Sequence, residues 1–472
     1  MYLRKSPPDF GKVKTWLRVP IPGDLTLRKS QRMTLVLIII NVVVYLVSSF
    51  ENGFIEIGDY WVSAGAFVPM FIASPSQWYR ILSSMFLHAD LFHLLFNMYF
   101  LFIFGRAVET SLGRGRFLLL YFSSGIVASL FHTAFGFVED PISYAVPAIG
   151  ASGAISGILG AYLMLYPGTS MLLVLPIFLL PWFFWIRASY YILFWFATQV
   201  IYGFAKAAGG TAVFAHAGGF VAGIALLSVL ASKERVSQLR LLSSMSFPNY
   251  LRFTAHARRG LGRFTKAVVS VLLLSLLAGS AYSSLLSADQ GSIKSIDLQY
   301  TCNGVPYSDY VVFQSRDIDP QISNIPVTTT RILMNRLSAA SLLYNSSYAN
   351  GKELKISNWT SELPVKVVLG SSASTVNVPT TIHSFKGIYD PDGFLAQAQG
   401  SLTTSAINIA LQGGVYKITL VESLNYDFSI SCETIALKLI TEYTGALSTS
   451  LTAWAIIVVA FRDRSLAVVG ED

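Results

Sequence analysis

The feature that most constrains this chain is a series of apolar runs, several of which reach about 18 residues or more. A helix of that length crosses the roughly 30 Å of hydrocarbon in a bilayer. Of the 472 residues, 53% are hydrophobic and only 13% are charged, a balance unsuited to a soluble protein. The chain is therefore predicted to be a multi-pass membrane protein in contact with the lipid bilayer.

The apolar runs predict eight spans, at residues 33–50, 90–104, 117–137, 151–166, 187–205, 215–231, 267–286 and 445–461. The stretch 167–186 is also apolar, but Pro176 and Pro181 interrupt it. We expect this stretch to be an interfacial or re-entrant piece rather than a further crossing.

The distribution of basic residues predicts the orientation. Residues 233–266 carry an excess of arginine and lysine, which marks a cytosolic loop. The same rule places the basic segment 1–32 in the cytosol, so residues 287–444 must lie outside. Both termini are then cytosolic, and we expect the plasma membrane as the location. The net charge of +8 is explained by these loops, so no nucleic-acid partner is expected.

This topology divides the chain into seven parts: a basic segment at 1–32, a six-span core at 33–232, a basic cytosolic linker at 233–266, a seventh transmembrane helix at 267–286, an extracytoplasmic domain at 287–444, an eighth transmembrane helix at 445–461 and a cytosolic tail at 462–472. The extracytoplasmic domain has short β-branched runs separated by turn residues, so it is expected to be mainly β. Within it, residues 331–344 suggest a helix. A hairpin is expected from 415–421 and 426–431.

The chain has two cysteines, Cys302 and Cys432, and both lie in the region expected outside. An oxidising compartment permits a disulfide. We expect them to pair, with two unpaired thiols as the alternative. Neither belongs to a cluster with the spacing of metal ligands, so no metal is expected. No cofactor is expected either, because water and two side chains suffice for the chemistry inferred below.

Polar residues at the starts of three spans suggest a reactive site. The second, fourth and sixth spans all run from outside to inside, so their first residues lie at a similar depth. His93 and Asn97 begin the second span, Ser152 the fourth and His216 the sixth. Scattered polar residues would not be expected to share one depth, and polar groups inside membranes usually have a function.

The glycine spacing predicts that Ser152 and His216 meet. Gly153 and Gly157 follow the serine, and Gly219 and Gly223 follow the histidine. Small residues four apart allow membrane helices to approach closely, which would place the hydroxyl beside the imidazole.

That arrangement suits a serine nucleophile with its base. Residues 151–232 contain no Asp or Glu, so a Ser152/His216 dyad is predicted. His93 and Asn97 would donate to an oxyanion. The alternative interpretations are a helix-packing serine and a histidine with a structural hydrogen bond; the joint occurrence favours chemistry.

The same motifs resemble the rhomboid intramembrane serine proteases. The resemblance rests on residues 86–98, with His93 and Asn97, on Gly150-Ala151-Ser152-Gly153, and on Ala215-His216-Ala217-Gly218-Gly219. It covers about 34–231, nearly half the chain. It implies Ser152 as nucleophile, His216 as base, and His93 and Asn97 as oxyanion-hole side chains.

The resemblance also implies a substrate class and a fold. The substrates would be single-span transmembrane proteins that enter past the second and fifth spans. Residues 51–88 would be a membrane-embedded first loop and 206–214 a mobile cap. The expected fold class is a membrane all-α six-helix rhomboid bundle, plus two further transmembrane helices flanking a mainly β extracytoplasmic domain.

One departure from the family pattern concerns the residue four positions after the nucleophile. Many rhomboids have an aromatic residue there to stack on the histidine, whereas this chain has Ser156. The region after 231 has no counterpart in the six-span family core, and an extracytoplasmic partner of 287–444 is one hypothesis for it. Two alternative functions are a catalytically silent client-binding or quality-control protein and an adhesion or receptor role of the outer domain.

Overall fold

A computed structural model describes residues 32–136, 144, 146–177, 180–207, 212–245, 260–286, 292–313, 318, 322, 325, 327–349, 351–369, 372–412 and 415–471. Most of the expected N-terminal segment, residues 246–259 of the expected linker and residues 208–211 of the expected cap lie outside these ranges.

A helical stretch occupies each of the expected spans. They are α2 (Arg32–Ser48), α5 (Leu91–Phe100) continued by η6 (Leu101–Gly105) and α6 (Arg106–Leu112), α7 (Arg114–Ala134), α9 (Ser152–Leu165), α10 (Ala188–Phe204), α11 (Val213–Leu230), α13 (Arg263–Leu286) and α16 (Leu437–Phe461). Within the described part of the chain, five stretches are long and apolar enough to cross a membrane, at 91–112, 114–134, 213–230, 263–285 and 440–461. The chain is a multi-pass membrane protein, and the prediction of eight spans is confirmed in part.

The shorter helices explain the difference. α9 has 14 residues, which at 1.5 Å per residue gives about 21 Å, less than the thickness of the hydrocarbon. Every residue from 153 to 165 is buried. Because α9 is surrounded by other helices and not by lipid, its length need not match the bilayer. An apolar run in the sequence does not distinguish these two surroundings.

Close contact between α9 and α11 follows from the glycines that the sequence places there. A methyl group added to Gly219 would overlap the carbonyl of Gly153, and one added to Gly223 would overlap the backbone of Gly157. On its other side, Gly157 contacts the side chain of Ser124 in α7. The backbones of α9 and α11 are therefore in direct contact over the first turns of α9.

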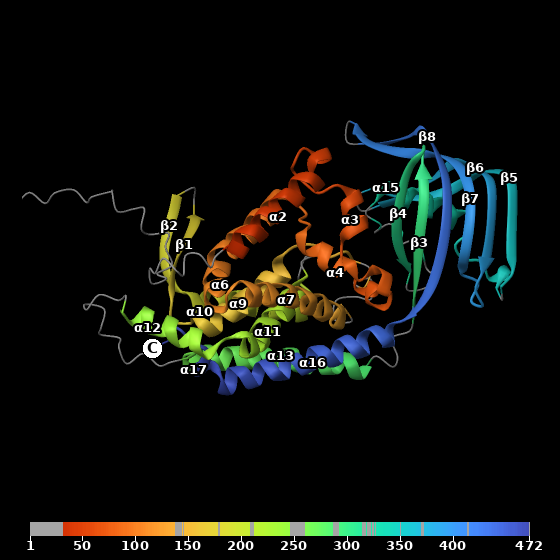
Figure 1. The fold of residues 1–472 in the computed structure, drawn as a ribbon. Coiled ribbons are helices and arrows are strands. Elements are labelled where there is room, and N and C mark those ends of the chain that lie inside the picture. Colours follow the sequence, from red (N-terminus) through yellow and green to blue (C-terminus); the bar gives the residue numbers. More distant parts are fainter. Residues whose placement is uncertain are drawn as a thin grey trace, which may run out of the picture.

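The proline-interrupted stretch forms an antiparallel pair of strands, β1 (Ser170–Ile177) and β2 (Leu180–Arg187), with Pro176 opposite Pro181. It is therefore not a helical crossing. The pair projects at the end of the bundle where α12 (Lys233–Met245) also lies (Figure 1).

The region predicted to be mainly β is confirmed as such over residues 292–436. Its six strands are antiparallel in the order β4-β3-β8-β7-β6-β5, with bounds β3 (Ser292–Cys302), β4 (Val305–Phe313), β5 (Glu353–Leu369), β6 (Ser372–Tyr389), β7 (Leu395–Gln412) and β8 (Val415–Ala436). Helix α15 (Thr328–Ala339) corresponds to the expected helix, and its Leu333 and Leu337 share a buried cluster with the sheet.

The hairpin expected within residues 415–431 is wrong. β8 runs unbroken through this stretch and pairs with β7 along its length. Ser423 pairs with Ser405 and Val421 with Ala406, so Glu422 is an extra residue at a β-bulge. A bulge absorbs one residue without reversing the chain, and the polar run 422–425 resembles a turn only in composition.

The expected disulfide is also wrong, because no bond joins Cys302 and Cys432. In the pairing of β3 with β8, Cys302 lies opposite Tyr426 and Cys432 lies opposite Ile296. Six residues of strand separate the two positions, or about 20 Å. A disulfide needs Cα atoms within roughly 7 Å. The strand register keeps the thiols apart although the strands are neighbours.

The β domain contacts the first loop, residues 51–88, at the end of the bundle where α3 (Asp59–Gly65) and α4 (Tyr79–Ser83) lie (Figure 1). Tyr310 of β4 packs edge-on against Phe71, with ring centroids 4.6 Å apart. Its hydroxyl accepts a hydrogen bond from Gln77 Nε2 (2.6 Å) and donates to Asp297 Oδ2 (3.3 Å). Gln77 Oε1 accepts from Arg80 Nε at 2.7 Å. Loop and sheet thus share one polar and aromatic contact.

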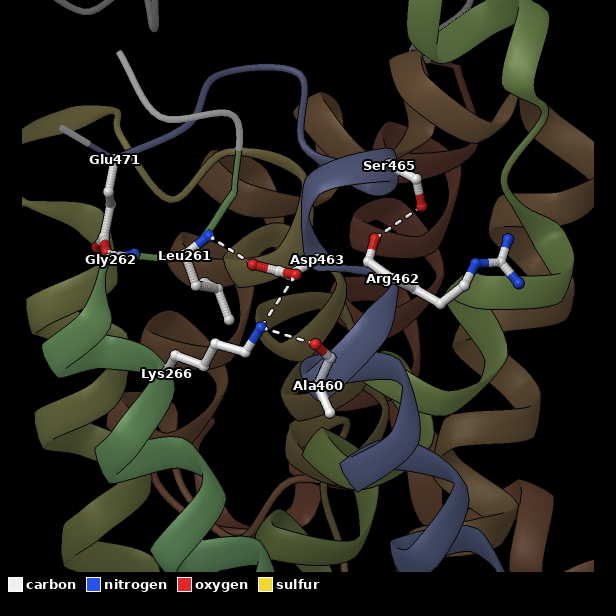
Figure 2. A network of polar contacts seen from close by, with 8 residues as sticks. All are labelled: Leu261, Gly262, Lys266, Ala460, Arg462, Asp463, Ser465 and Glu471. Atoms are coloured by element: carbon white, nitrogen blue, oxygen red, sulfur yellow. Dashed lines mark hydrogen bonds and ion pairs between the residues drawn. The ribbon is translucent and has the colours of Figure 1, made fainter. Parts of the chain in front are cut away.

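Polar contacts hold the C-terminal residues against the segment that precedes and begins α13 (Figure 2). Asp463 accepts from the backbone N–H of Leu261 at 3.3 Å and forms an ion pair with Lys266 at 3.2 Å. Glu471 accepts from the backbone N–H of Gly262. Carboxylates at this position complement the unpaired N–H groups and the dipole of the start of α13.

We predict that Gly223→Ala destabilises the protein by about 1–3 kcal/mol, the usual cost of overpacking a tight contact. The added methyl group would meet the backbone of Gly157. The thermal unfolding midpoint of the detergent-solubilised protein measures the effect. The matched control is Gly115→Ala in α7, where an added methyl group meets nothing within 4 Å. Equal midpoints for the two variants would contradict the packing argument.

We also predict that Asp309→Asn stabilises the β domain at neutral pH by about 1–2 kcal/mol, the range for an imperfectly satisfied buried polar group. Asp309 is 8% exposed, and burial raises the pKa of its carboxyl despite the opposing effect of neighbouring Thr330. A raised folded-state pKa means that the ionised form opposes folding, so wild-type stability increases as pH falls towards the unfolded-state pKa.

The gain from Asp309→Asn should therefore be present at pH 7.5 and shrink as the pH falls towards pH 4, near the ordinary pKa of an aspartate in the unfolded chain. Thermal unfolding at the two pH values measures it. Asp427→Asn, at an exposed position on β8, is the control and should show no such pH-dependent gain. An Asp309→Asn protein less stable than wild type at pH 7.5 would refute the prediction.

Candidate active site

A cavity of about 730 Å³ opens between α5, α7, α9, α10 and α11. Its walls include all four polar residues predicted to form the site, His93, Asn97, Ser152 and His216. The shared depth inferred from the order of the spans thus corresponds to one common cavity.

The Ser152 hydroxyl and the His216 imidazole are in contact. Ser152 is the first residue of α9, and its Oγ lies 2.8 Å from His216 Nε2. His216 is in the first turn of α11, which begins at Val213. The approach of α9 to α11 through their glycines brings these two turns together.

A third side chain, which the sequence analysis missed, holds the other side of the imidazole. Gln199 of α10 places its Oε1 2.8 Å from His216 Nδ1. The predicted dyad rests on the absence of Asp and Glu from 151–232, and a glutamine can also accept this hydrogen bond. A glutamine within an apolar span is itself an uncommon polar residue, and that signal was available.

His93 is oriented by its own helix start. Asp90 caps α5 by accepting from the backbone N–H of His93 at 2.8 Å. The N–H of Ala89 donates to His93 Nδ1 at 3.4 Å. An accepting Nδ1 leaves the proton on Nε2 in neutral histidine. Nε2 is the ring atom that a methyl group added to Gly150 would meet first, so this donor lies beside the turn that precedes Ser152.

Asn97 lies one turn further along α5. Its Nδ2 donates to the backbone carbonyl of His93 at 2.9 Å, which uses one of the two amide protons. The second proton remains for another acceptor. His93 and Asn97 therefore lie on one face of α5, as their spacing predicts.

Ser156, where an aromatic residue was expected, makes a local bond instead. Its Oγ donates to the backbone carbonyl of Ser152 at 2.6 Å. The aromatic neighbour of His216 comes from α10, where the Trp195 ring lies with its centroid 6.0 Å from that of the imidazole and tilted by 38°. The aromatic contact is retained from a different helix.

Two further histidines lie in or beside the site. His132 lines the cavity, and its Nδ1 has no hydrogen-bond partner among the described residues. His88 is fully buried, with its ring centroid 5.1 Å from that of His93.

These features define a multi-pass membrane protein in which a serine hydroxyl is hydrogen-bonded to an imidazole in a cavity among the helices. Residues 75–233 match the family model described as Rhomboid domain. The chain therefore contains a rhomboid domain, and the model does not extend to the C-terminal region.

Several curated proteins share this stretch. The chain is 42% identical over 89 residues to "Putative rhomboid protease YdcA" of Bacillus subtilis (strain 168), which is 19% of this chain and 42% of that protein. It is 42% identical over 92 residues to "Rhomboid protease GluP" of the same organism, covering 20% and 17%. It is 40% identical over 85 residues to "Inactive RHOMBOID-like protein 8" of Arabidopsis thaliana, covering 18% and 22%. The matches thus span less than half the length of each of these relatives.

We predict that Gly150→Ala displaces His93 and slows the reaction of Ser152 with a fluorophosphonate by about 100-fold, a typical effect of a 1 Å misplacement. Gly150 has φ +124°, and an added methyl group would lie 2.8 Å from His93 Nε2. Gly304→Ala is the control, because Gly304 has φ +82° in the β3–β4 turn with nothing within 4 Å. Similar labelling rates for both variants would refute the idea that Gly150 is needed to leave room for the His93 ring.

Proposed function

We propose that the protein is an intramembrane serine endopeptidase that cleaves single-span membrane proteins in or near their transmembrane segment. The observation that carries the proposal is the 2.8 Å contact between Ser152 Oγ and His216 Nε2 on the wall of a cavity between membrane helices. Ser152 would be the nucleophile and His216 the general base. Rhomboid protease is also the description of two of the relatives.

In the proposed reaction, His216 Nε2 takes the Ser152 proton as Oγ attacks the scissile carbonyl carbon. The carbonyl electron pair moves to oxygen and forms a tetrahedral oxyanion. When this intermediate collapses, the C–N bond breaks and His216 gives its proton to the leaving amine. Water then attacks the acyl-enzyme by the same route, which restores the Ser152 hydroxyl.

The oxyanion would accept hydrogen bonds from His93 Nε2, from Asn97 Nδ2 and from the backbone N–H of Ser152. The N–H groups of the first turn of a helix have no partner within the helix, and the dipole favours negative charge there. Each such donor lowers the barrier by roughly 3 kcal/mol in serine proteases. The first turn of α9 thus would supply both the nucleophile and a donor.

The lipid-facing sides of α5 and α10 support lateral entry of a transmembrane substrate. Phe92 and Phe96 of α5 and Phe194 of α10 are each more than 60% exposed, as is appropriate for side chains in lipid. Phe96 also lines the cavity, as does Trp195 on the next position of α10. A substrate helix that passes between α5 and α10 would reach Ser152 without crossing a polar surface.

We further propose that residues 287–444 lie outside the plasma membrane with both termini in the cytosol, and that this domain binds an extracytoplasmic partner or orients substrates. The contact of Tyr310 with Phe71 supports the second role, because it keeps the β domain beside the first loop.

A catalytically silent client-binding protein is the second candidate, because one relative bears the description inactive. Reactivity of Ser152 distinguishes the two functions. A silent protein would bind membrane proteins and leave them intact.

We predict that wild-type protein in lipid vesicles is labelled by a fluorophosphonate and cleaves a single-span reporter. Ser152→Ala should abolish labelling and lower cleavage by about 1,000-fold or more. The matched control is Ser156→Ala, one turn along α9, which loses only a bond to the Ser152 carbonyl and should remain labelled. Folded wild-type protein that is neither labelled nor active would exclude the protease function.

A further inference from the structure

Gln199 contacts the second ring nitrogen of His216, the proposed base. Its Oε1 lies 2.8 Å from His216 Nδ1, on the side of the ring opposite Ser152. Gln199 is 9% exposed, so little water reaches this bond. Both ring nitrogens of His216 are thereby occupied by named partners.

The tautomer of His216 follows from these contacts. Nε2 must be unprotonated to accept the hydroxyl proton of Ser152, so neutral His216 carries its proton on Nδ1. Nδ1–H donates, and an amide oxygen can only accept. An oxygen at this position therefore favours the reactive tautomer over the alternative one.

The amide of Gln199 is itself oriented. Its Nε2 lies 3.3 Å from the backbone carbonyl of Trp195 and 3.2 Å from Thr198 Oγ1. The Thr198 hydroxyl donates its proton to the Trp195 carbonyl at 2.7 Å, so the hydroxyl oxygen can act only as an acceptor towards the Gln199 amide. Because both neighbours of Gln199 Nε2 are acceptors, the amide nitrogen faces them and Gln199 Oε1 faces the imidazole.

We infer that Gln199 is a positioning residue that completes a Ser152–His216–Gln199 triad with a neutral third member. The inference rests on the proposed protease function and adds the group that sets the orientation and tautomer of the base. When His216 accepts the serine proton, its bond to Gln199 becomes charge-assisted and therefore stronger. The stabilisation appears as charge develops, which is the condition for it to accelerate the reaction.

A neutral acceptor suits this environment. An ionised carboxylate beside His216 would need solvation that a buried site between membrane helices does not provide. An amide supplies the same accepting oxygen without that cost. Trp195, from the preceding turn of α10, covers the imidazole, so one helix provides both the acceptor and the aromatic contact.

A kinetic test compares Gln199→Leu with Gln199→Glu. Gln199→Leu removes the acceptor at similar volume and should lower kcat by about 10- to 100-fold, the effect of losing one hydrogen bond to a group that becomes charged, while KM changes little. Gln199→Glu keeps an accepting carbonyl oxygen in its neutral, protonated form, whose O–H can donate where the amide donates now, and should recover most of kcat. Gln238→Leu on α12, an exposed position far from the cavity, should match wild type. Wild-type kcat in Gln199→Leu, or a Gln199→Glu protein as slow as Gln199→Leu, would overturn the inference.

A second measurement does not depend on activity. In full-length protein carrying ¹⁵N-labelled histidine, the His216 signals, identified by their loss in His216→Asn, should show the proton on Nδ1. In Gln199→Leu the population should shift towards the Nε2–H form. An unchanged tautomer would overturn the role of Gln199 even if Ser152 proves to be the nucleophile. The expected shift in a protein without protease activity would support the positioning role and count against the proposed function alone.

Discussion

The contact between Ser152 and His216 depends on how closely α9 approaches α11. The hydroxyl and imidazole are short side chains on different helices, so a 2.8 Å bond requires backbones in contact. Gly153 and Gly157 meet Gly219 and Gly223, where no side chain larger than hydrogen fits. In a membrane, where lipid is as apolar as the helix surface, such contact rests on van der Waals packing more than on hydrophobic burial. The contact of Ser152 with His216 and the packing of α9 on α11 are therefore determined by the same first turns of the two helices.

The sequence predicted these two helices well because the relevant information is local and periodic. Glycines four apart define one face, and Ser152 and His216 lie at the end of each face. His93 and Asn97 follow the same logic within α5. The contact of Gln199 is of a different kind, because it depends on where the loop after α10 returns the chain to α11. The length of that loop does not determine which α10 residue faces His216.

Other differences have equally specific physical origins. Two strand-like runs, 415–421 and 426–431, suggest a hairpin when 422–425 is taken as the turn, but a β-bulge at Glu422 allows one long strand to continue. The expected disulfide needed the register of β3 against β8, which composition does not contain. The length of α9 reflects its burial among other helices. Each of these depends on a neighbour that is distant in sequence.

The region beyond the rhomboid domain contacts the end of α9 and the first loop. Leu165 at the close of α9 accepts from the backbone N–H groups of Val468 and Val469, at 2.6 and 3.2 Å. These bonds satisfy a carbonyl that the helix leaves unpaired. The second contact joins the β domain to Phe71 in the first loop.

The first loop in turn is hydrogen-bonded to the residues that immediately precede Ser152. Phe67 exchanges backbone bonds with Ala148 at 2.7 and 3.1 Å, and Ser84 accepts from the N–H of Gly150 at 2.9 Å. The turn that aims Ser152 into the cavity is thus built against the same loop that supports the β domain. Because the extension contacts this loop and the end of α9, it forms part of the scaffold of the candidate site. A six-helix core without it would leave the Leu165 carbonyl and the apolar surface around Phe71 to other partners.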